Sequence, residues 1–227
     1  MTDVFHPSVL DPTARTVVDR LQRKASKQLP TLFRHYLPRL PSMLLGRPVR
    51  PPRDIGFFDD KLLPLNLAQG DLLYLLARAR RPRCAVEFGT SFGVSTIYLA
   101  AAIRDAGCGG RVIGTELVPA KAAAAQANLA AAGLANLVEI REGDARETLA
   151  CVDEQVDFLL LDGWPQLALD VLRAVEPSLS NGAIVFVDNV AQFRTELKPV
   201  VERLSSPTWR TSMLPFRSGT LVAVRES

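Results

Sequence analysis

Residues 85–95 read AVEFGTSFGVS, and this stretch decides the fold of the chain. A short apolar run ends in two glycines four positions apart, Gly89 and Gly93, and a helix-length stretch follows. Glycines at such a turn let a ligand approach the backbone, and the first turn of a helix offers unpaired N–H groups. Because Ser91 stands between the glycines, the turn differs from the GxGxxG pattern that binds dinucleotide pyrophosphates. The stretch therefore predicts a strand, a ligand-binding turn and a helix in succession.

Glu87 lies at the end of this first strand. A carboxylate at that place disfavours a pyrophosphate and suits a ligand that carries a cationic amino-acid group. A strand–turn–helix unit that binds no ligand is the alternative interpretation. If a ligand binds here, we expect it to contact Glu87, Gly89, Ser91, Gly93 and Ser95.

Strand-like and helix-like segments alternate along the chain on either side of this stretch. Short β-rich runs are separated by helix-length stretches, which is typical of a parallel sheet covered by helices on both faces. The expected strands are 83–88, 111–116, 137–142, 156–161 and 182–188, and the expected helices are 66–80, 93–106, 119–132, 145–150, 166–177 and 193–204. Residues 208–214 and 219–225 are expected to form a final hairpin. The fold class is therefore α/β.

Acidic residues recur where the next two strands end. Glu116 ends the second strand, where a carboxylate can accept hydrogen bonds from both hydroxyls of a ribose. Asp144 follows the third strand, beside Ala145, where it could accept a hydrogen bond from an adenine amino group. A helix N-cap is the alternative role for Asp144. With Glu87, these acids predict a nucleoside site at the edge where open parallel sheets bind ligands.

These motifs resemble those of class I S-adenosylmethionine-dependent methyltransferases, and their spacing is closest to the catechol O-methyltransferase-like family. EFGTSFGVS (87–95) resembles the first motif of that family, TEL (115–117) its ribose-binding acid and GDAR (143–146) its adenine-binding segment. The resemblance implies a Rossmann-like, doubly wound sheet of seven strands, mostly parallel, with an antiparallel last strand inserted into it. It also implies S-adenosylmethionine as the cofactor and methyl transfer to a hydroxyl group as the reaction.

Two further motifs resemble the metal site of that family. They are LDGW (161–164) and VDNV (187–190), and the family residues that match Asp162, Asp188 and Asn189 bind a divalent metal, usually Mg²⁺. Two carboxylates and an amide oxygen are hard ligands that suit Mg²⁺, whereas a plain Asp-Asn turn after a strand is the alternative. Asp162 is also expected to be the catalytic residue and to contact the cofactor. Trp164 is expected to edge the adenine or cover the acceptor, with plain packing as the alternative.

The sequence departs from the family pattern in two places. Family members that methylate aromatic hydroxyls commonly have a lysine shortly after the Asp that matches Asp162, and here that position is Pro165. Arg217 and Ser218 also replace the acidic residue that helps to hold a catechol near the last hairpin. A metal-bound hydroxyl is already acidified, so a lysine is not indispensable. The expected acceptor is a small molecule with a phenolic or other metal-chelating hydroxyl, and catechol itself is left open.

The first 53 residues differ in composition from the rest of the chain. Residues 1–53 hold ten Arg or Lys against three Asp and half of the prolines, whereas residues 54–227 hold seventeen Arg or Lys against twenty-one acids. We therefore expect a basic, Pro-rich helical extension at 1–53 and a methyltransferase domain at 54–227. The extension would contain helices at 8–28 and 31–45, interrupted by prolines, and a connector at 46–53. It would serve as a lid or in a homodimer, or alternatively bind the phosphates of a tRNA.

Composition excludes several classes of protein. A chain of 227 residues that is 48% hydrophobic can bury a full core. Its apolar runs are far shorter than the roughly 18 residues that span a bilayer, and its start does not resemble a secretory signal. Three cysteines without a CxxC pair indicate reduced thiols and a cytoplasmic protein. A tRNA-modifying methyltransferase and a cofactor-binding relative without catalytic activity remain the alternative functions.

Overall fold

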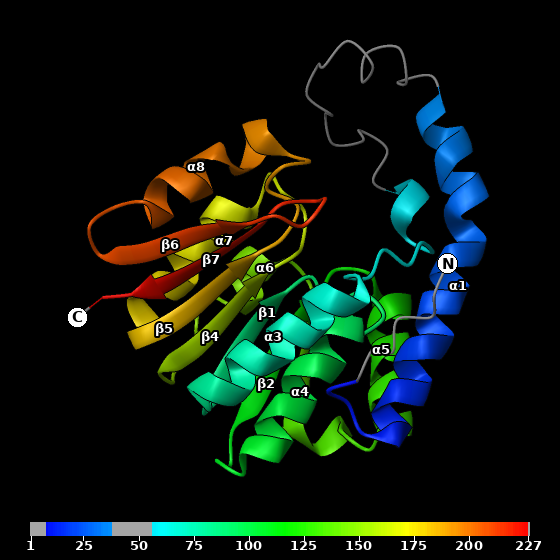
Figure 1. Ribbon diagram of the computed structural model, residues 1–227, viewed down its shortest axis with the longest axis horizontal. Coiled ribbons are helices and arrows are strands. Elements are labelled where there is room, and N and C mark those ends of the chain that lie inside the picture. The colour runs from blue at the N-terminus through cyan, green and yellow to red at the C-terminus, as the bar shows by residue number, and fades with distance from the viewer. Residues whose placement is uncertain (1–7, 38–55, 227) are drawn as a thin grey trace.

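The computed structural model describes residues 8–37 and 56–226, and its centre is a seven-stranded sheet (Figure 1). The strands are β1 Cys84–Phe88, β2 Arg111–Glu116, β3 Val138–Glu142, β4 Val156–Leu161, β5 Leu179–Val187, β6 Trp209–Leu214 and β7 Thr220–Arg225. Their order is β3-β2-β1-β4-β5-β7-β6. β7 is antiparallel to both of its neighbours, and the other paired strands run parallel. The predicted α/β sheet with an inserted antiparallel last strand is confirmed.

Helices cover both faces of this sheet, as near-continuous apolar strands require. They are α1 Pro12–Tyr36, α3 Leu67–Arg80, α4 Val94–Ala106, α5 Pro119–Ala131, α6 Ala145–Thr148, α7 Ala168–Val175 and α8 Arg194–Leu204. Short 3-10 turns occupy Gly56–Phe58, Ala135–Leu137 and Glu176–Ser178. Buried residues of α1, α3, α4 and α5 form one hydrophobic core with one face of the strands, and those of α6, α7 and α8 form a second core with the other face. Figure 1 shows α3 and α4 together on the first of these faces. None of the helices in the described part of the chain is long and apolar enough to cross a membrane.

The turn after β1 lies where the strand order reverses, because β1 pairs with β2 on one side and β4 on the other. Gly89 has φ +101°, and a Cβ on it would lie 2.7 Å from the backbone nitrogen of Gly163, which follows β4. Only a glycine therefore lets the turns after β1 and β4 come into backbone contact. In open α/β sheets this reversal opens a crevice for ligands.

α1 is a single helix, and the predicted interruption at Pro30 is wrong. Pro30 lies inside α1, whose buried residues include Ala25 before the proline and Leu32 after it. The side chain of Gln28 also donates a hydrogen bond to the carbonyl of Asp60 (3.1 Å) and accepts one from the backbone N–H of Leu62 (2.9 Å). Tertiary contacts on both sides of Pro30 thus offset the hydrogen bond that the proline removes. The predicted helix beyond residue 37 and the connector at 46–53 lie outside the described residues, so the domain boundary at residue 53 stays a prediction.

The N-terminal half of α1 belongs to the core of the molecule. Its buried side chains share a core with α4, and Asp11 forms an ion pair with Arg104 of α4 (2.8 Å). Arg20 donates a hydrogen bond to Asn128 of α5 (2.7 Å), which in turn donates one to the carbonyl of Phe92 in the turn after β1 (2.9 Å). α1 therefore supports the turn after β1, where the sequence predicts a ligand. Its role as a lid or in a homodimer stays a prediction.

Candidate active site

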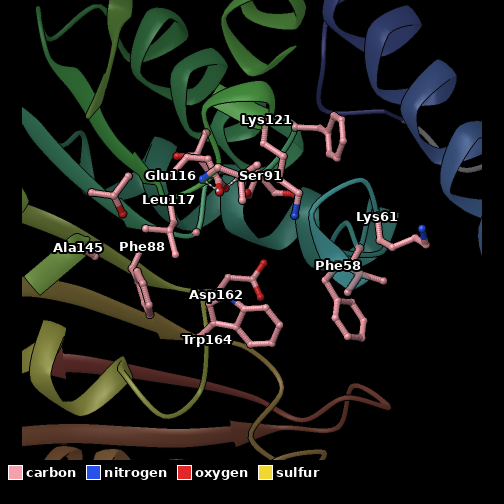
Figure 2. A pocket seen from close by; sticks show the side chains of 18 of the residues that line it. Phe58, Lys61, Phe88, Ser91, Glu116, Leu117, Lys121, Ala145, Asp162 and Trp164 are labelled. Atoms are coloured by element: carbon pink, nitrogen blue, oxygen red, sulfur yellow. Dashed lines mark hydrogen bonds between the residues drawn. The ribbon is translucent and has the colours of Figure 1, made fainter. Parts of the chain in front are cut away.

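A cavity opens at the carboxyl ends of β1, β2 and β4, where the sequence predicted a ligand site (Figure 2). The predicted residues that line this cavity are Gly89, Ser91, Ser95, Glu116, Asp144, Ala145, Asp162, Trp164 and Asn189. Three other predicted residues, Glu87, Gly93 and Asp188, are not among its lining residues. The structure thus brings nine of the twelve predicted site residues to one cavity.

Glu116 is held in place by the backbone on both sides of it. One carboxylate oxygen accepts a hydrogen bond from the N–H of Ser91 and the other accepts one from the N–H of Val118, each at 2.8 Å. Each carboxylate oxygen can accept more than one hydrogen bond, so both oxygens of Glu116 could still accept hydrogen bonds from the hydroxyls of a ligand in the cavity. The arrangement agrees with the predicted ribose site.

Glu87 lies behind the cavity and is fully buried. Its Oε2 accepts hydrogen bonds from the hydroxyls of Thr90 (3.0 Å) and Thr96 (2.5 Å). Its Oε1 has no hydrogen-bond partner among the described residues. Burial raises the pKa of Glu87, and the hydroxyl donors partly offset this effect. Direct contact between Glu87 and a cofactor stays a prediction, because the structure shows only that its carboxyl lies close behind the turn.

Gly93 and Asp144 both lie at the start of a helix. Gly93 is the N-cap of α4, with φ +84°, and a Cβ on it would lie 3.3 Å from the Cβ of Ala125 in α5. Asp144 caps α6 by accepting a hydrogen bond from the N–H of Arg146 (2.9 Å), and the Arg146 guanidinium holds the pKa of Asp144 below its usual range. The cap foreseen as an alternative for Asp144 is therefore present, and its side chain lines the cavity as well.

Asp162 and Asp188 lie one residue beyond β4 and β5. The N–H of Asp162 donates to the carbonyl of Phe88, and the N–H of Asp188 donates to the carbonyl of Leu161 (3.0 and 3.1 Å). These bonds extend the parallel pairing and place the two carboxyls at the same edge. The pKa of Asp162 lies well above its usual value because of burial, with further contributions from the charges of Asp188 and Glu87.

The pair of carboxyls fits a divalent cation. Asn189, at φ +63°, donates from Nδ2 to Oδ1 of Asp162 (3.1 Å), and a rotation of its amide would present an oxygen instead. The half-buried carboxylate of Asp162, the buried carboxylate of Asp188 and an amide oxygen form a hard donor set, and a divalent cation would offset the repulsion between the two carboxylates. No group of three His, Cys, Asp or Glu in the described ranges could hold a metal. A metal at this edge would therefore depend on the amide of Asn189 and on oxygens from water or acceptor.

Aromatic side chains form the wall next to Asp162, and Trp164 is one of them. The rings of Trp164 and Phe58 meet edge to face, with centroids 5.8 Å apart. Figure 2 shows both rings on the side of Asp162, away from Ser91 and Glu116. Tyr36, the last residue of α1, lines the same cavity. The packing expected as the alternative for Trp164 is thus present, at the cavity surface.

Sequence reasoning missed several lining residues, among them Lys61 and Lys121. Burial lowers the pKa of Lys121, and the nearby Glu116 and Asp59 partly offset this effect. Lys121 is the only charged residue in the alanine-rich stretch 119–132, and this isolation was a usable signal. Phe58 and Lys61 precede every recognisable motif, so no pattern indicated them.

Comparison with known proteins agrees with this geometry. A family model of a methyltransferase domain matches residues 86–190. The chain is 36% identical over 129 residues to a catechol O-methyltransferase of Mycobacterium tuberculosis (strain ATCC 25618 / H37Rv), covering 56% of this chain and 57% of that protein. It is 30% identical over 178 residues to an O-methyltransferase-family protein of Mycobacterium sp. (strain JLS), covering 70% of this chain and 78% of that protein.

A solved structure shares the fold as well. It is the O-methyltransferase TomG from Streptomyces achromogenes in complex with S-adenosylmethionine, with a TM-score of 0.66 and 26% identity. The match covers 79% of this chain and 92% of TomG. The chain spans about half the length of the first curated relatives that it matches. Sequence, sheet order and cavity together show that the chain belongs to the class I S-adenosylmethionine-dependent methyltransferases, in the catechol O-methyltransferase-like family of O-methyltransferases.

Proposed function

We propose that the protein transfers a methyl group from S-adenosylmethionine to a hydroxyl of a small acceptor, with the assistance of a divalent metal. The observation that carries the proposal is that one cavity is lined by Ser91 and Glu116 on one side and by Asp162 and Trp164 on the other, with Asn189 also among its lining residues. Such a cavity can hold a nucleoside donor next to an acceptor, and holding the two reactants together is itself a large part of catalysis.

The first side of the cavity would bind the cofactor. S-adenosylmethionine supplies a methyl group on a positively charged sulfur. Glu116 would accept hydrogen bonds from the ribose hydroxyls, and Asp144 and Ala145 would lie along the adenine. The carboxyls of Glu87 and Asp162 lie behind and beside the turn and would favour the positive charge of the donor.

Glu116→Ala is expected to weaken the binding of S-adenosylmethionine at least about tenfold. Each charge-assisted hydrogen bond to the ribose is worth roughly 1.5–3 kcal/mol, and two would be lost. Calorimetric titration measures the affinity, and circular dichroism checks that the fold is kept. Glu139→Ala on β3 is the matched control, since Glu139 is a half-buried carboxylate that does not line the cavity. Unchanged affinity in Glu116→Ala would contradict the ribose assignment.

The second side would bind the metal and the acceptor. Asp162, Asp188 and Asn189 would hold a divalent ion such as Mg²⁺, which supplies a lowered pKa to a hydroxyl bound next to it. Trp164 and Phe58 offer an aromatic wall to a flat acceptor. A phenol or another metal-chelating hydroxyl fits both features. Pro165 replaces the family lysine, so no side chain at that position can take the proton.

An acceptor panel tests this function. With Mg²⁺ and S-adenosylmethionine present, we expect acceptors with two adjacent hydroxyls to be methylated faster than the matching single phenols, because only the former chelate a metal. Mass spectrometry of the products and release of S-adenosylhomocysteine measure the reaction. Equal rates for both acceptor types would contradict the chelation, and absence of product with every acceptor would favour a cofactor-binding protein without turnover.

A further inference from the structure

Three side-chain donors converge on one oxygen of Asp188. Its Oδ1 accepts hydrogen bonds from Nε2 of Gln69 (2.6 Å), from the hydroxyl of Ser218 (3.0 Å) and from the hydroxyl of Thr220 (3.2 Å). Gln69 and Thr220 are buried, with 2% and 0% of their surfaces exposed. All three side-chain donors bind Oδ1 and none of them donates to Oδ2, so they favour Oδ2 as the oxygen that the carboxylate offers to the rest of the site.

Gln69 differs from the other two donors because its opposite end is fixed as well. It is the third residue of α3, and its Oε1 accepts hydrogen bonds from the backbone N–H (3.3 Å) and from Nδ2 (2.6 Å) of Asn66. A backbone N–H can only donate, so the oxygen of the Gln69 amide must face Asn66. Its NH₂ group must then face Asp188. The capping box of α3 thereby sets the orientation of an amide that crosses to the end of β5.

We propose that Gln69 is the positioning residue for Asp188, and that it holds Oδ1 so that Oδ2 is presented to the divalent ion. This inference rests on the proposed metal site. An amide suits the task because it donates hydrogen bonds without carrying a charge, so the carboxylate keeps its full attraction for a cation. Residues that orient metal ligands in this way typically change metal affinity about 10- to 100-fold when they are replaced.

A capping role alone is the competing explanation, and it predicts a different pattern. Asn66→Ala removes the side chain that caps α3 but leaves the backbone N–H that faces Oε1 of Gln69. It should therefore lower the melting temperature and leave metal affinity within about threefold, since a lost cap acts on helix stability. Gln69→Leu keeps a similar volume but removes the donor to Asp188, so it should lower metal affinity.

The experiment titrates Mn²⁺ into the full chain saturated with S-adenosylhomocysteine and follows the free ion by electron paramagnetic resonance. We expect Gln69→Leu to weaken Mn²⁺ binding at least about tenfold, while the affinity for S-adenosylhomocysteine stays within about twofold. Gln22→Leu is the matched control, because Gln22 donates to the carbonyl of Leu65 (2.7 Å) and does not contact Asp188. If Gln69→Leu fails to fold, Gln69→Asn shortens the side chain so that its amide cannot contact both Asn66 and Asp188, and it should weaken Mn²⁺ binding at least about tenfold.

The possible outcomes distinguish a failure of the role of Gln69 from a failure of the proposed metal site. Wild-type protein that binds Mn²⁺ together with Gln69→Leu that binds it equally well would overturn the role of Gln69 alone. Equal losses of Mn²⁺ affinity in Asn66→Ala and Gln69→Leu would mean that metal affinity depends on the cap of α3 and not on the hydrogen bond from Gln69 to Asp188, which would overturn the positioning role. Wild-type protein that does not bind Mn²⁺ would overturn the metal site and the role of Gln69 together.

Discussion

Asp188→Ala is expected to lower the rate of methyl transfer by roughly two to four orders of magnitude. The proposed metal contributes several kcal/mol by acidifying and holding the acceptor hydroxyl, and each 1.4 kcal/mol corresponds to about a tenfold change in rate. The affinity for S-adenosylmethionine should change little, because Asp188 is not among the residues that line the cavity. Excess chelator should have the same effect on the wild-type enzyme, and Mg²⁺ or Mn²⁺ should restore it.

Steady-state rates with and without chelator measure this effect, and calorimetry measures cofactor affinity in parallel. Asp170→Ala is the matched control, because Asp170 is an exposed aspartate on α7, away from the cavity. Full activity of the wild type in excess chelator would mean a metal-free reaction. The base would then have to be sought among cavity residues such as Lys61 and Lys121.

Asp162→Asn is expected to abolish nearly all activity and, at the same time, to stabilise the metal-free protein. Burial and the neighbouring charges of Asp188 and Glu87 raise the pKa of Asp162, so its ionised form is unfavourable in the folded chain. An asparagine keeps an oxygen for the amide of Asn189 and removes the charge. For a chain of this length, each kcal/mol gained should raise the melting temperature by about 2–4 °C.

The difference in stability between Asp162→Asn and the wild type should depend on pH. Because the folded pKa of Asp162 is raised, its proton stabilises the folded state fully below about pH 4, and this contribution is lost as the pH rises through the folded pKa. The stability advantage of Asp162→Asn should therefore be small near pH 4 and grow toward neutral pH. Melting temperatures in chelator across this range measure it, and adding Mg²⁺ should favour the wild type. An advantage of equal size at every pH would mean that the charge of Asp162 is not its cause.

Most of the fold could be predicted because most of its elements have a recognisable pattern over a few neighbouring residues. The glycine turn, the apolar strands and the final hairpin each have a short-range pattern, and the parallel sheet follows from the alternation of strands and helices. The acids at the strand ends were equally visible, since Asp162 follows an apolar run directly, and Glu116 and Asp144 stand at or just after the ends of β-rich runs. One local pattern gave a wrong prediction. Pro30 predicts a break in α1, but packing on both sides of the proline keeps the helix continuous.

The residues that could not be predicted reach the site from other parts of the chain. Tyr36 and Phe58 enter the cavity from segments without a motif, and Tyr36 does so only because α1 passes Pro30 as one helix. Asn66 and Gln69 match a capping box, so their spacing predicts the start of a helix. It does not reveal that the Gln69 amide contacts Asp188, which lies 119 positions away in the sequence.

The position of β7 also determines when the site can be completed during synthesis. β5 pairs with β7, not with β6, so the sheet edge next to Asp188 has no partner until both later strands have been made. The residues of the proposed cofactor side all precede residue 165, whereas Ser218 lies just before β7 and Thr220 begins it. A nascent chain that lacks β7 would therefore already contain every residue of the proposed nucleoside side, while Asp188 would still lack two of its three donors. Docking of the last hairpin would thus close the sheet and complete the proposed acceptor side together, and a chain whose last hairpin has not docked would expose an unpaired strand edge that is prone to aggregation.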